Sequence, residues 1–404
     1  MRILFVLDRV ENPASANAQL ACRLAEELLQ QGHTVHLLEL WDGETPPPAP
    51  PAGASQHTLP FADERLMNRA LENGAKTGSP VPLRLLRLAA HPTAVAAAFR
   101  QLVLHNPRRT VDSRRKIERL DAEFHFDAVC AVCAPYRTAF ALETAQISGK
   151  KLLWQLDPYA SNKDYTAPGG YAREGQLLQA IDTAFITPQA LPDYEGGPLS
   201  AWRDKVQVLG FPVLLAGGPV PPHTGLRCVF CGSLYPTLRE PDFALKLFTA
   251  LNAPDLTLTM AGRGWEPFEA AAQEAQAVLG ARITRPGLLP PAEAATLEAG
   301  ADILLSLGNA FDNQMPSKLF SYLGTGKPLL HLAVTDTDPT LPYLARYPLA
   351  LVLHEKDGAT PEVIAALRRW LTDVQGKQLP YAQVAALYPE FTPGVVAQTF
   401  VARI

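Results

Sequence analysis

The sequence has few of the features that mark secreted, membrane-spanning or nucleic-acid-binding proteins. Its 404 residues include five cysteines, an odd number, and carry a formal net charge of -4. Nucleic acid is therefore not expected as a partner, because binding its phosphates needs a basic surface. No apolar run is long enough to cross a bilayer, and Met1 and Arg2 lead directly into a strand-like run without a signal peptide. We therefore expect a cytoplasmic protein.

Metal-binding motifs are also scarce. Cys130 and Cys133, and likewise Cys228 and Cys231, have the two-residue separation found in metal and redox sites. Both pairs lie inside apolar, strand-like runs, whereas a zinc knuckle would lie in a turn with a glycine nearby. We therefore expect reduced thiols that belong to the core, and no metal site.

The glycine-rich dinucleotide fingerprint is missing from the first βαβ pattern. That pattern consists of an apolar run over 2–7, an amphipathic helix over 16–31 and a second strand over 34–40. Alternating strands and helices of this kind predict an α/β fold with doubly wound parallel sheets. Because no G-x-G-x-x-G motif follows the first strand, a nicotinamide or flavin cofactor is not expected.

Proline and glycine are concentrated in two segments. The segment 45–53 is rich in proline and can form neither a helix nor a central strand, so we expect an exposed excursion. The segment 210–223 is rich in both residues and has the composition of an interdomain linker. We therefore predict two Rossmann-like domains, over 1–212 and 213–385.

The stretch 82–118 is basic, and its arginines alternate with apolar residues at helical spacing. One interpretation is a peripheral helix that touches an anionic membrane or a lipid-linked substrate. The other is a set of surface helices that pack on the sheet and keep their arginines in water. Pro92 and Pro107 divide the stretch into short pieces, which favours the second interpretation.

The stretch from Asn309 to Leu330 carries the clearest chemistry. A polar loop follows an apolar run over 301–307 and leads into a helix with Pro316 in its first position, where proline is well tolerated. The first N–H groups of a helix have no intrahelical partners, and the macrodipole adds partial positive charge, so this end favours an anion. Lys318 adds a full charge. A diphosphate is a candidate ligand; the alternative is that Lys318 is an ordinary solvated lysine.

The pattern Asn-x-x-Pro-Ser-Lys-Leu-Phe-x-Tyr-Leu-x-x-Gly-Lys-Pro, which begins at Asn313, resembles the donor-binding segment of GT-B glycosyltransferases. It is similar to the large retaining group that uses nucleotide sugars and includes glycosyltransferase family 4. In that group two glutamates stand eight positions apart; the first contacts the sugar and the second holds the ribose hydroxyls. Here these positions hold Asn313 and Ser321. A serine hydroxyl binds a ribose more weakly than a carboxylate does.

The resemblance continues through the second half of the chain. The run from Phe230 to Leu234 is similar to the Phe-x-Gly-x-Leu opening of GT-B donor domains. Its glycine, Gly232, would let a diphosphate or sugar approach the backbone closely. Downstream, Arg239 stands where the family often places a cation that faces the phosphates.

Two further segments match the family in order. Gly262-Arg263-Gly264 follows a strand-like run and matches the family's Gly-x-Gly pattern. The segment 283–289, which contains Gly287 and Leu288, matches the part whose backbone usually reads the nucleobase.

In the first half, the resemblance is carried by architecture and by Asp157-Pro158. These residues end a strand over 151–156, and ligands of open α/β sheets gather at the carboxyl ends of strands. Related enzymes carry a polar residue there, often histidine, so Asp157 would bind the acceptor or take its proton. The alternative is that Asp157 only caps a turn. The resemblance also implies that the first loop, over 14–17, faces the acceptor and that a helix within 386–404 crosses back to the first domain.

The resemblance as a whole implies a GT-B fold, with an acceptor-binding domain and a donor-binding domain facing each other across a cleft. The activity would be transfer of a sugar, with retention of configuration, from a nucleotide diphosphate sugar to a saccharide, lipid-linked or protein acceptor. Lys318 and Arg239 or Arg263 would stabilise the leaving diphosphate, so that neither a metal nor a cofactor is expected.

The expected site therefore has two sets of residues. The catalytic set is Asp157, Lys318 and Arg239. Two other functions stay open: a catalytically weak or inactive binding subunit, which Ser321 suggests, and an epimerase of nucleotide sugars, which shares the architecture. The expected substrate-binding residues are Gly232, Ser233, Gly262, Arg263, Gly287, Leu288, Asn309, Asp312, Asn313, Pro316, Ser317 and Ser321.

Overall fold

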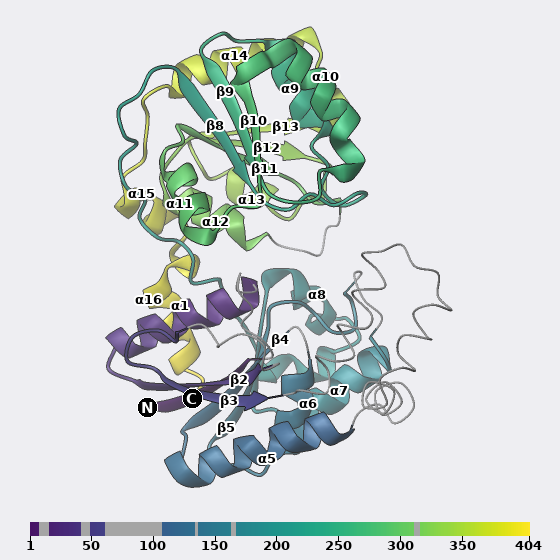
Figure 1. Cartoon of the computed structure of the whole chain (residues 1–404). Helices are drawn as coiled ribbons and strands as arrows, with labels where there is room; N and C mark the ends of the chain where they lie inside the picture. The colour runs from purple at the N-terminus through teal and green to yellow at the C-terminus, as the bar shows by residue number, and fades with distance from the viewer. Residues whose placement is uncertain (8–15, 42–48, 61–106, 134–135, 163–166, 311–315) are drawn as a thin grey trace, which may run out of the picture. The chain divides into compact units, whose positions relative to one another are not determined.

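The computed structural model describes residues 1–7, 16–41, 49–60, 107–133, 136–162, 167–310 and 316–404 (Figure 1). The chain divides into two compact units. The first comprises Met1–Leu209 together with Ala397–Ile404, and the second comprises Gly210–Val396. Within the described residues, no helix is long and apolar enough to cross a membrane.

The first unit is built on a seven-stranded parallel sheet with the order β3-β2-β1-β4-β5-β6-β7. The order reverses between β1 and β4, which makes the carboxyl ends of these two strands the switch point where ligands of such sheets bind. The runs of β1 and β4 are apolar because both faces of the sheet are covered. The strands are β1 (Arg2–Leu7), β2 (Thr34–Trp41), β3 (Ser55–Pro60), β4 (Ala128–Cys133), β5 (Lys150–Gln155), β6 (Thr183–Ile186) and β7 (Val206–Val208).

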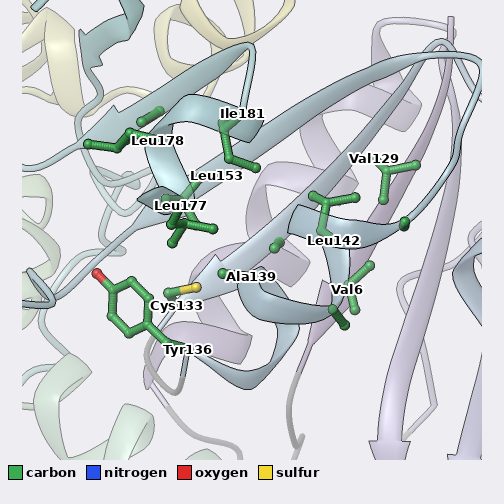
Figure 2. Packing of buried hydrophobic residues seen from close by; sticks show 14 of the residues in the cluster. Val6, Val129, Cys133, Tyr136, Ala139, Leu142, Leu153, Leu177, Leu178 and Ile181 are labelled. Atoms are coloured by element: carbon green, nitrogen blue, oxygen red, sulfur yellow. The ribbon is translucent and has the colours of Figure 1, made fainter. Parts of the chain in front are cut away.

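Helices cover both faces of this sheet. On one face, α6 and α7 pack their apolar side chains against those of β4 and β5 in a continuous core (Figure 2). On the other face, Phe400 of the last helix stacks on Phe185, with 4.9 Å between ring centroids, and lies 5.5 Å from the ring of Phe5. The helices are α1 (Ala16–Gln30), α5 (Pro107–Phe124), α6 (Arg137–Thr144), α7 (Gly170–Ala180), α8 (Leu191–Tyr194) and α16 (Pro393–Val401), and the short 3-10 turns are η1 (Pro188–Ala190) and η2 (Ser200–Lys205).

The second unit is built on a six-stranded parallel sheet with the order β10-β9-β8-β11-β12-β13. Its order reverses between β8 and β11. The strands are β8 (Leu226–Cys231), β9 (Leu256–Ala261), β10 (Ile283–Gly287), β11 (Ile303–Leu307), β12 (Leu329–Ala333) and β13 (Ala350–His354).

One face of the second sheet forms a core with α9, α10 and α14, while α11 contacts β8 and α12 contacts α15 (Figure 1). The 3-10 turns are η3 (Glu266–Phe268), η4 (Gly280–Arg282), η5 (Glu355–Asp357) and η6 (Pro389–Phe391). The helices are α9 (Asp242–Leu251), α10 (Glu269–Leu279), α11 (Pro291–Ala299), α12 (Ser317–Gly324), α13 (Leu341–Leu344), α14 (Pro361–Val374) and α15 (Tyr381–Leu387).

The predicted α/β architecture of parallel sheets is confirmed, with two local differences. Strand β3 was not expected from the sequence. Helix α12 begins at Ser317, so the placement of Pro316 in the first helical position is wrong by one residue. The φ of Pro316 is -71°, which suits a helix, but its ψ of 106° is extended, so it acts as the N-cap.

The paired cysteines are free thiols, and Cys130, Cys133, Cys228 and Cys231 are all buried, as expected of core residues. Of the basic stretch 82–118, only residues from 107 onward are described. There α5 buries Ile117 and leaves the Arg115 side chain 66% exposed, which is the geometry of a helix packed on a sheet.

A histidine pair, in which His36 is buried and His57 is half-buried, joins β2 to the edge strand β3. His36 Nδ1 lies 2.9 Å from His57 Nε2, and the two rings stack with 5.3 Å between centroids. Burial lowers the pKa of His36 to about 4, and the charges of His57 and Arg2 act in the same direction. Burial also lowers the pKa of His57.

These lowered pKa values predict that acid removes the stability that the histidine pair contributes to the first unit. The unfolded histidines bind protons below about pH 6.5, whereas folded His36 resists protonation down to about 4, so stability present above the unfolded pKa is lost as pH falls between these values. Because water screens part of this pair, we expect a loss of about 1 kcal/mol. Thermal unfolding at about pH 7.5 and about pH 5 should show a smaller loss in His36→Gln than in the wild-type protein. Equal losses in both proteins would contradict the assignment.

Candidate functional site

Four neighbouring strands of the second sheet end in segments that the sequence singles out. In sheet order, β10 ends at Gly287, β9 is followed by Gly262, β8 by Gly232 and β11 by Gly308 and Asn309. Because all these strands are parallel, their carboxyl ends lie along one edge of the sheet. The structure therefore brings these predicted donor-binding segments together, around the switch point between β8 and β11.

Glycine allows these strand-end loops to pack backbone against backbone. Gly262 has a φ of +149°, and a Cβ atom built on it would lie 1.7 Å from the carbonyl oxygen of Gly232. Its N–H donates to the carbonyl of Gly287 at 2.8 Å, and the N–H of Gly232 donates to the carbonyl of Ala261 at 2.9 Å. No side chain fits at Gly262, so the ends of β8, β9 and β10 are held together by direct backbone contact.

A neutral side chain orients the Arg239 guanidinium. Asn309 is 5% exposed, and its Oδ1 accepts from Arg239 Nε at 3.1 Å and Nη2 at 2.7 Å. A third, longer bond runs from Nη1 to the carbonyl oxygen of Ser233 at 3.5 Å. Burial lowers the pKa of Arg239, but a guanidinium stays protonated at neutral pH. The amide fixes the direction of this cation without neutralising it.

Sequence reasoning missed Tyr235, which lies between the two arginines of the site. Its backbone forms an isolated antiparallel bridge with Arg239, and its side chain is 42% exposed. Burial alone would raise the pKa of Tyr235, but hydrogen bonds with the side chains of Arg263 and Ser233 and the charges of Arg263 and Arg239 outweigh it and lower the pKa. The exposed Arg263 side chain is thereby tied to the loop that carries Arg239. The only sequence signal was an aromatic residue within the loop before a cation.

Lys318 has an anionic partner that the sequence did not reveal. Its Nζ lies 2.8 Å from Glu298 Oε1, a residue near the end of α11. The same carboxylate oxygen accepts a hydrogen bond from the Tyr322 hydroxyl at 3.3 Å. In turn, the backbone N–H of Cys231 donates to the Tyr322 hydroxyl at 3.2 Å. Glu298 therefore joins α11, α12 and the end of β8, and it balances the charge of Lys318.

The apolar face of α12 is held by an aromatic stack. Phe320 is buried and lies 3.6 Å, centroid to centroid, from Phe391, and its ring also meets the edge of Tyr343 at 5.1 Å. Ser321 is half-buried on the same helix. This packing fixes where the first turn of α12, with Lys318, lies in the second unit.

The structure describes some of the remaining predicted residues and not others. Leu288 follows β10 and is 59% exposed, and Pro316 is half-buried ahead of α12. Asp312 and Asn313 lie outside the described residues, as does the side chain of Ser317.

Asp157 belongs to the first unit, where it follows the carboxyl end of β5. Its Oδ2 accepts from Asn17 Nδ2 at 3.5 Å, and its backbone carbonyl accepts from the Tyr136 hydroxyl at 2.7 Å. Asn17 lies in the first turn of α1, after the first loop, so the structure brings together two segments that were both expected on the acceptor side.

Asp336 and Asp338 have the Asp-x-Asp spacing of paired carboxylate ligands, but their side chains have separate partners. Asp338 is 3% exposed, and His331 Nε2 and the Thr340 hydroxyl lie 3.0 Å and 2.6 Å from its carboxylate oxygens. Asp336 instead bonds Lys356 Nζ at 2.5 and 2.6 Å. Among the described residues, no group of three or more His, Cys, Asp or Glu side chains is placed to hold a metal ion.

Solved structures with a similar fold include GT-B glycosyltransferases. The chain aligns over 100% of its length with 98% of a sucrose-phosphate synthase from Thermosynechococcus elongatus, at 13% identity and a TM-score of 0.65. It aligns over 100% of its length with 99% of the lipopolysaccharide outer core galactosyltransferase WaaB, at 11% identity and a TM-score of 0.57. The chain thus has the GT-B fold of two Rossmann-like units.

The same fold also includes enzymes with other chemistry. A UDP-GlcNAc 2-epimerase from Neisseria meningitidis, solved with bound UDP-GlcNAc, is similar over 100% of this chain and 99% of its own, at 13% identity and a TM-score of 0.56. No protein-family model and no curated protein sequence matches the chain. At these identities, the likeness establishes the fold and leaves the reaction to the chemistry of the site.

The contact of Gly262 with Gly232 predicts a sharp asymmetry between two glycine substitutions. Gly262→Ala should lower the free energy of unfolding by about 2–3 kcal/mol, because the new Cβ would overlap a backbone carbonyl. Gly218→Ala is the matched control: its Cβ would meet nothing within 4 Å, so the change should stay within about 0.5 kcal/mol. Urea unfolding of the wild-type protein, Gly262→Ala and Gly218→Ala measures both changes in the free energy of unfolding. Similar stabilities of the two variants would show that the strand-end loops are not packed this way.

Proposed function

We propose that the chain is a glycosyltransferase that moves a sugar from a nucleoside diphosphate sugar to an acceptor hydroxyl. The GT-B fold supports this assignment, and the observation that carries it is the pairing of Arg239 with the buried amide of Asn309. The pairing sets the direction of a cation at the edge where β8 and β11 end, and no carboxylate bonds this cation among the described residues. The phosphate oxygens of a diphosphate accept hydrogen bonds from such a guanidinium, and the first N–H groups of α12 would be further donors.

The proposed role of the cations follows from the bond that breaks. When the bond between the anomeric carbon and the phosphate oxygen breaks, negative charge grows on the leaving nucleoside diphosphate. Arg239, Arg263 and Lys318, together with the first N–H groups of α12, would stabilise that charge in the transition state. Because these three cations would balance the charge, departure of the diphosphate needs no metal ion in this proposal.

The acceptor side of the proposal involves Asp157. A new bond forms between the anomeric carbon and the acceptor oxygen, with retention of configuration, and the acceptor proton passes to a base. Asp157 would bind the acceptor or take that proton, and its contact with Asn17 holds its carboxylate in place. The proposed acceptor is a saccharide, lipid-linked or protein group in surface polysaccharide or glycoconjugate synthesis, with peripheral membrane contact through 82–118.

A nucleotide-sugar epimerase is the second candidate, and the similarity to the UDP-GlcNAc 2-epimerase favours it. An epimerase would convert the donor sugar without any acceptor, which NMR spectroscopy of the donor detects directly. Ser321 favours a third possibility, a binding subunit with weak or no turnover, because a hydroxyl would replace the carboxylate that holds the ribose. Calorimetry with UDP-, GDP- and ADP-sugars, together with an assay of nucleoside diphosphate release, separates this subunit from an enzyme, which both binds its donor and turns it over.

Release of nucleoside diphosphate from a panel of UDP-, GDP- and ADP-sugars tests the transferase directly. Arg239→Gln and Lys318→Ala should each lower the rate by about tenfold to a thousandfold, because each removes a charge that stabilises the leaving group. Arg239→Lys should fall between Arg239→Gln and the wild type, since lysine keeps the charge but loses the two bonds to Asn309. Lys246→Ala, on an exposed position of α9, is the control. Turnover equal to that of the wild type in Arg239→Gln and Lys318→Ala would exclude the proposed role of these cations.

The pair of Lys318 with Glu298 leads to a separate expectation for binding. A diphosphate and Glu298 compete for the same ammonium, so Glu298→Gln should tighten binding of UDP, GDP or ADP by about threefold to tenfold. The gain should vanish when Lys318→Ala is also present, because the double mutant leaves no cation to release. Calorimetry on the two single variants and the double variant gives the comparison. Weaker binding by Glu298→Gln would mean that the carboxylate positions Lys318 and does not compete with the ligand.

A further inference from the structure

A buried polar network lies beneath the loop that follows β5 and carries Asp157. Gln155 is the last residue of the strand, and the loop continues to Ala160 and Ser161. Beneath it lie side chains from three other parts of the unit: Tyr136 ahead of α6, Glu174 in α7 and Tyr194 in α8. All three are at most 5% exposed.

Glu174 binds the chain on both sides of Asp157. Its Oε1 accepts from Gln155 Nε2 at 2.6 Å, and its Oε2 accepts from the backbone N–H of Ala160 at 2.9 Å. The Tyr194 hydroxyl lies 3.3 Å from the same Oε1 and 3.0 Å from Gln155 Oε1. One carboxylate, 2% exposed, thus fixes the end of the strand two residues before Asp157 and the loop three residues after it.

Tyr136 completes the network at Asp157 itself. Its hydroxyl donates to the backbone carbonyl of Asp157 at 2.7 Å and accepts from Gln155 Nε2 at 2.8 Å. The Tyr136 ring also meets the edge of Tyr159, with 4.8 Å between centroids. Gln155 Nε2 uses its two N–H groups on Tyr136 and Glu174, so the network is continuous from α7 to the Asp157 carbonyl.

Burying the carboxylate of Glu174 is unfavourable if the only requirement at this position is a stable core. Burying its charge is unfavourable unless each oxygen has donors, and apolar side chains of similar size often give equal or greater stability. Burial raises the pKa of Glu174, while the bonds from Gln155, Ala160 and Tyr194 oppose this change. What the carboxylate supplies that an apolar residue cannot is a fixed position for two separate donors.

We propose that Glu174 is a positioning residue that holds Asp157, through Gln155, Tyr136 and the Ala160 amide, in the geometry that the acceptor requires. This inference rests on the proposed function, because it takes Asp157 as the acceptor-side group. Glu174 itself touches no substrate. Its action is to keep the short loop in one conformation, so that the Asp157 carboxylate is already oriented when the acceptor binds.

Glu174→Gln is the most selective perturbation. The glutamine amide has nearly the same shape as the carboxylate, but it offers one acceptor oxygen and an NH2 group. Gln155 Nε2 and the Ala160 N–H are both donors, so the NH2 group must face one of them and lose that hydrogen bond. Glu143→Gln is the matched control: Glu143 forms an ion pair with Arg173, the neighbour of Glu174 on α7, at 2.8 Å, and the bonds from Glu174 to Gln155 and to the Ala160 amide involve neither residue.

Hydrogen exchange of the loop gives a readout that needs no substrate. In Glu174→Gln the Ala160 amide should exchange about tenfold faster or more, because the NH2 group faces a donor at one of the two anchors and loosens the loop in either orientation, whereas Glu143→Gln should match the wild-type protein. If exchange in Glu174→Gln stays at the wild-type rate, the anchoring is wrong, whatever the reaction is.

Kinetics then separates positioning from general destabilisation. With whichever of the UDP-, GDP- and ADP-sugars is turned over, Glu174→Gln should lower kcat for diphosphate release about tenfold, with the Kd for the nucleoside diphosphate unchanged, because that ligand binds the second unit. Faster exchange of Ala160 with an unchanged kcat would overturn the positioning role. If the wild-type protein turns over none of the sugars, it is the proposed function that fails, and the exchange experiment still decides the anchoring.

A second variant guards against misfolding of Glu174→Gln. Tyr136→Phe removes the hydrogen bond to the Asp157 carbonyl without leaving a buried charge unmatched. It should lower kcat in the same direction by about threefold, again with the Kd for nucleoside diphosphate unchanged. A wild-type kcat in Tyr136→Phe, with a folded protein by circular dichroism, would also overturn the proposal.

Discussion

The second unit depends on the contact between two strand-end loops at the carboxyl edge of its sheet. Gly262 lies so close to the Gly232 carbonyl that only hydrogen can occupy the position of its side chain. This approach, with the bonds from Gly232 to Ala261 and from Gly262 to Gly287, fixes the ends of β8, β9 and β10 relative to one another. In the proposed function, this packing would hold steady the edge at which Arg239 and Lys318 meet a diphosphate.

The side chains of Arg239 and Lys318 have partners of different charge. Arg239 bonds the neutral amide of Asn309, so its direction is set and its full charge stays available. Lys318 bonds the carboxylate of Glu298, and this negative charge weakens the attraction of Lys318 for another anion. In the proposed function, Arg239 would be a preorganised contact for the diphosphate, whereas Lys318 would have to exchange Glu298 for it, so the two residues would contribute differently to affinity and to stabilisation of the leaving group.

Sequence patterns predicted the features that depend on local composition. Apolar runs such as that of β1 and β4 became central strands, and the two-sheet α/β architecture followed from their alternation with helices. Strand β3 was missed because an edge strand, with polar residues, lacks the apolar run that marks buried strands. Glu298 and Glu174 were missed for another reason: each acts through partners distant in sequence, at Lys318 and Ala160, and no local pattern records such contacts.

The most direct test of the account is a crystal structure of the protein soaked in turn with UDP, GDP and ADP. We predict that the diphosphate lies against the backbone of Gly232. A phosphate oxygen should bond the Arg239 guanidinium, and the bonds from Arg239 to Asn309 should be retained. Lys318 Nζ should move from Glu298 to the phosphate. A nucleotide bound elsewhere, or one whose phosphates touch neither Arg239 nor the first turn of α12, would contradict the central claim.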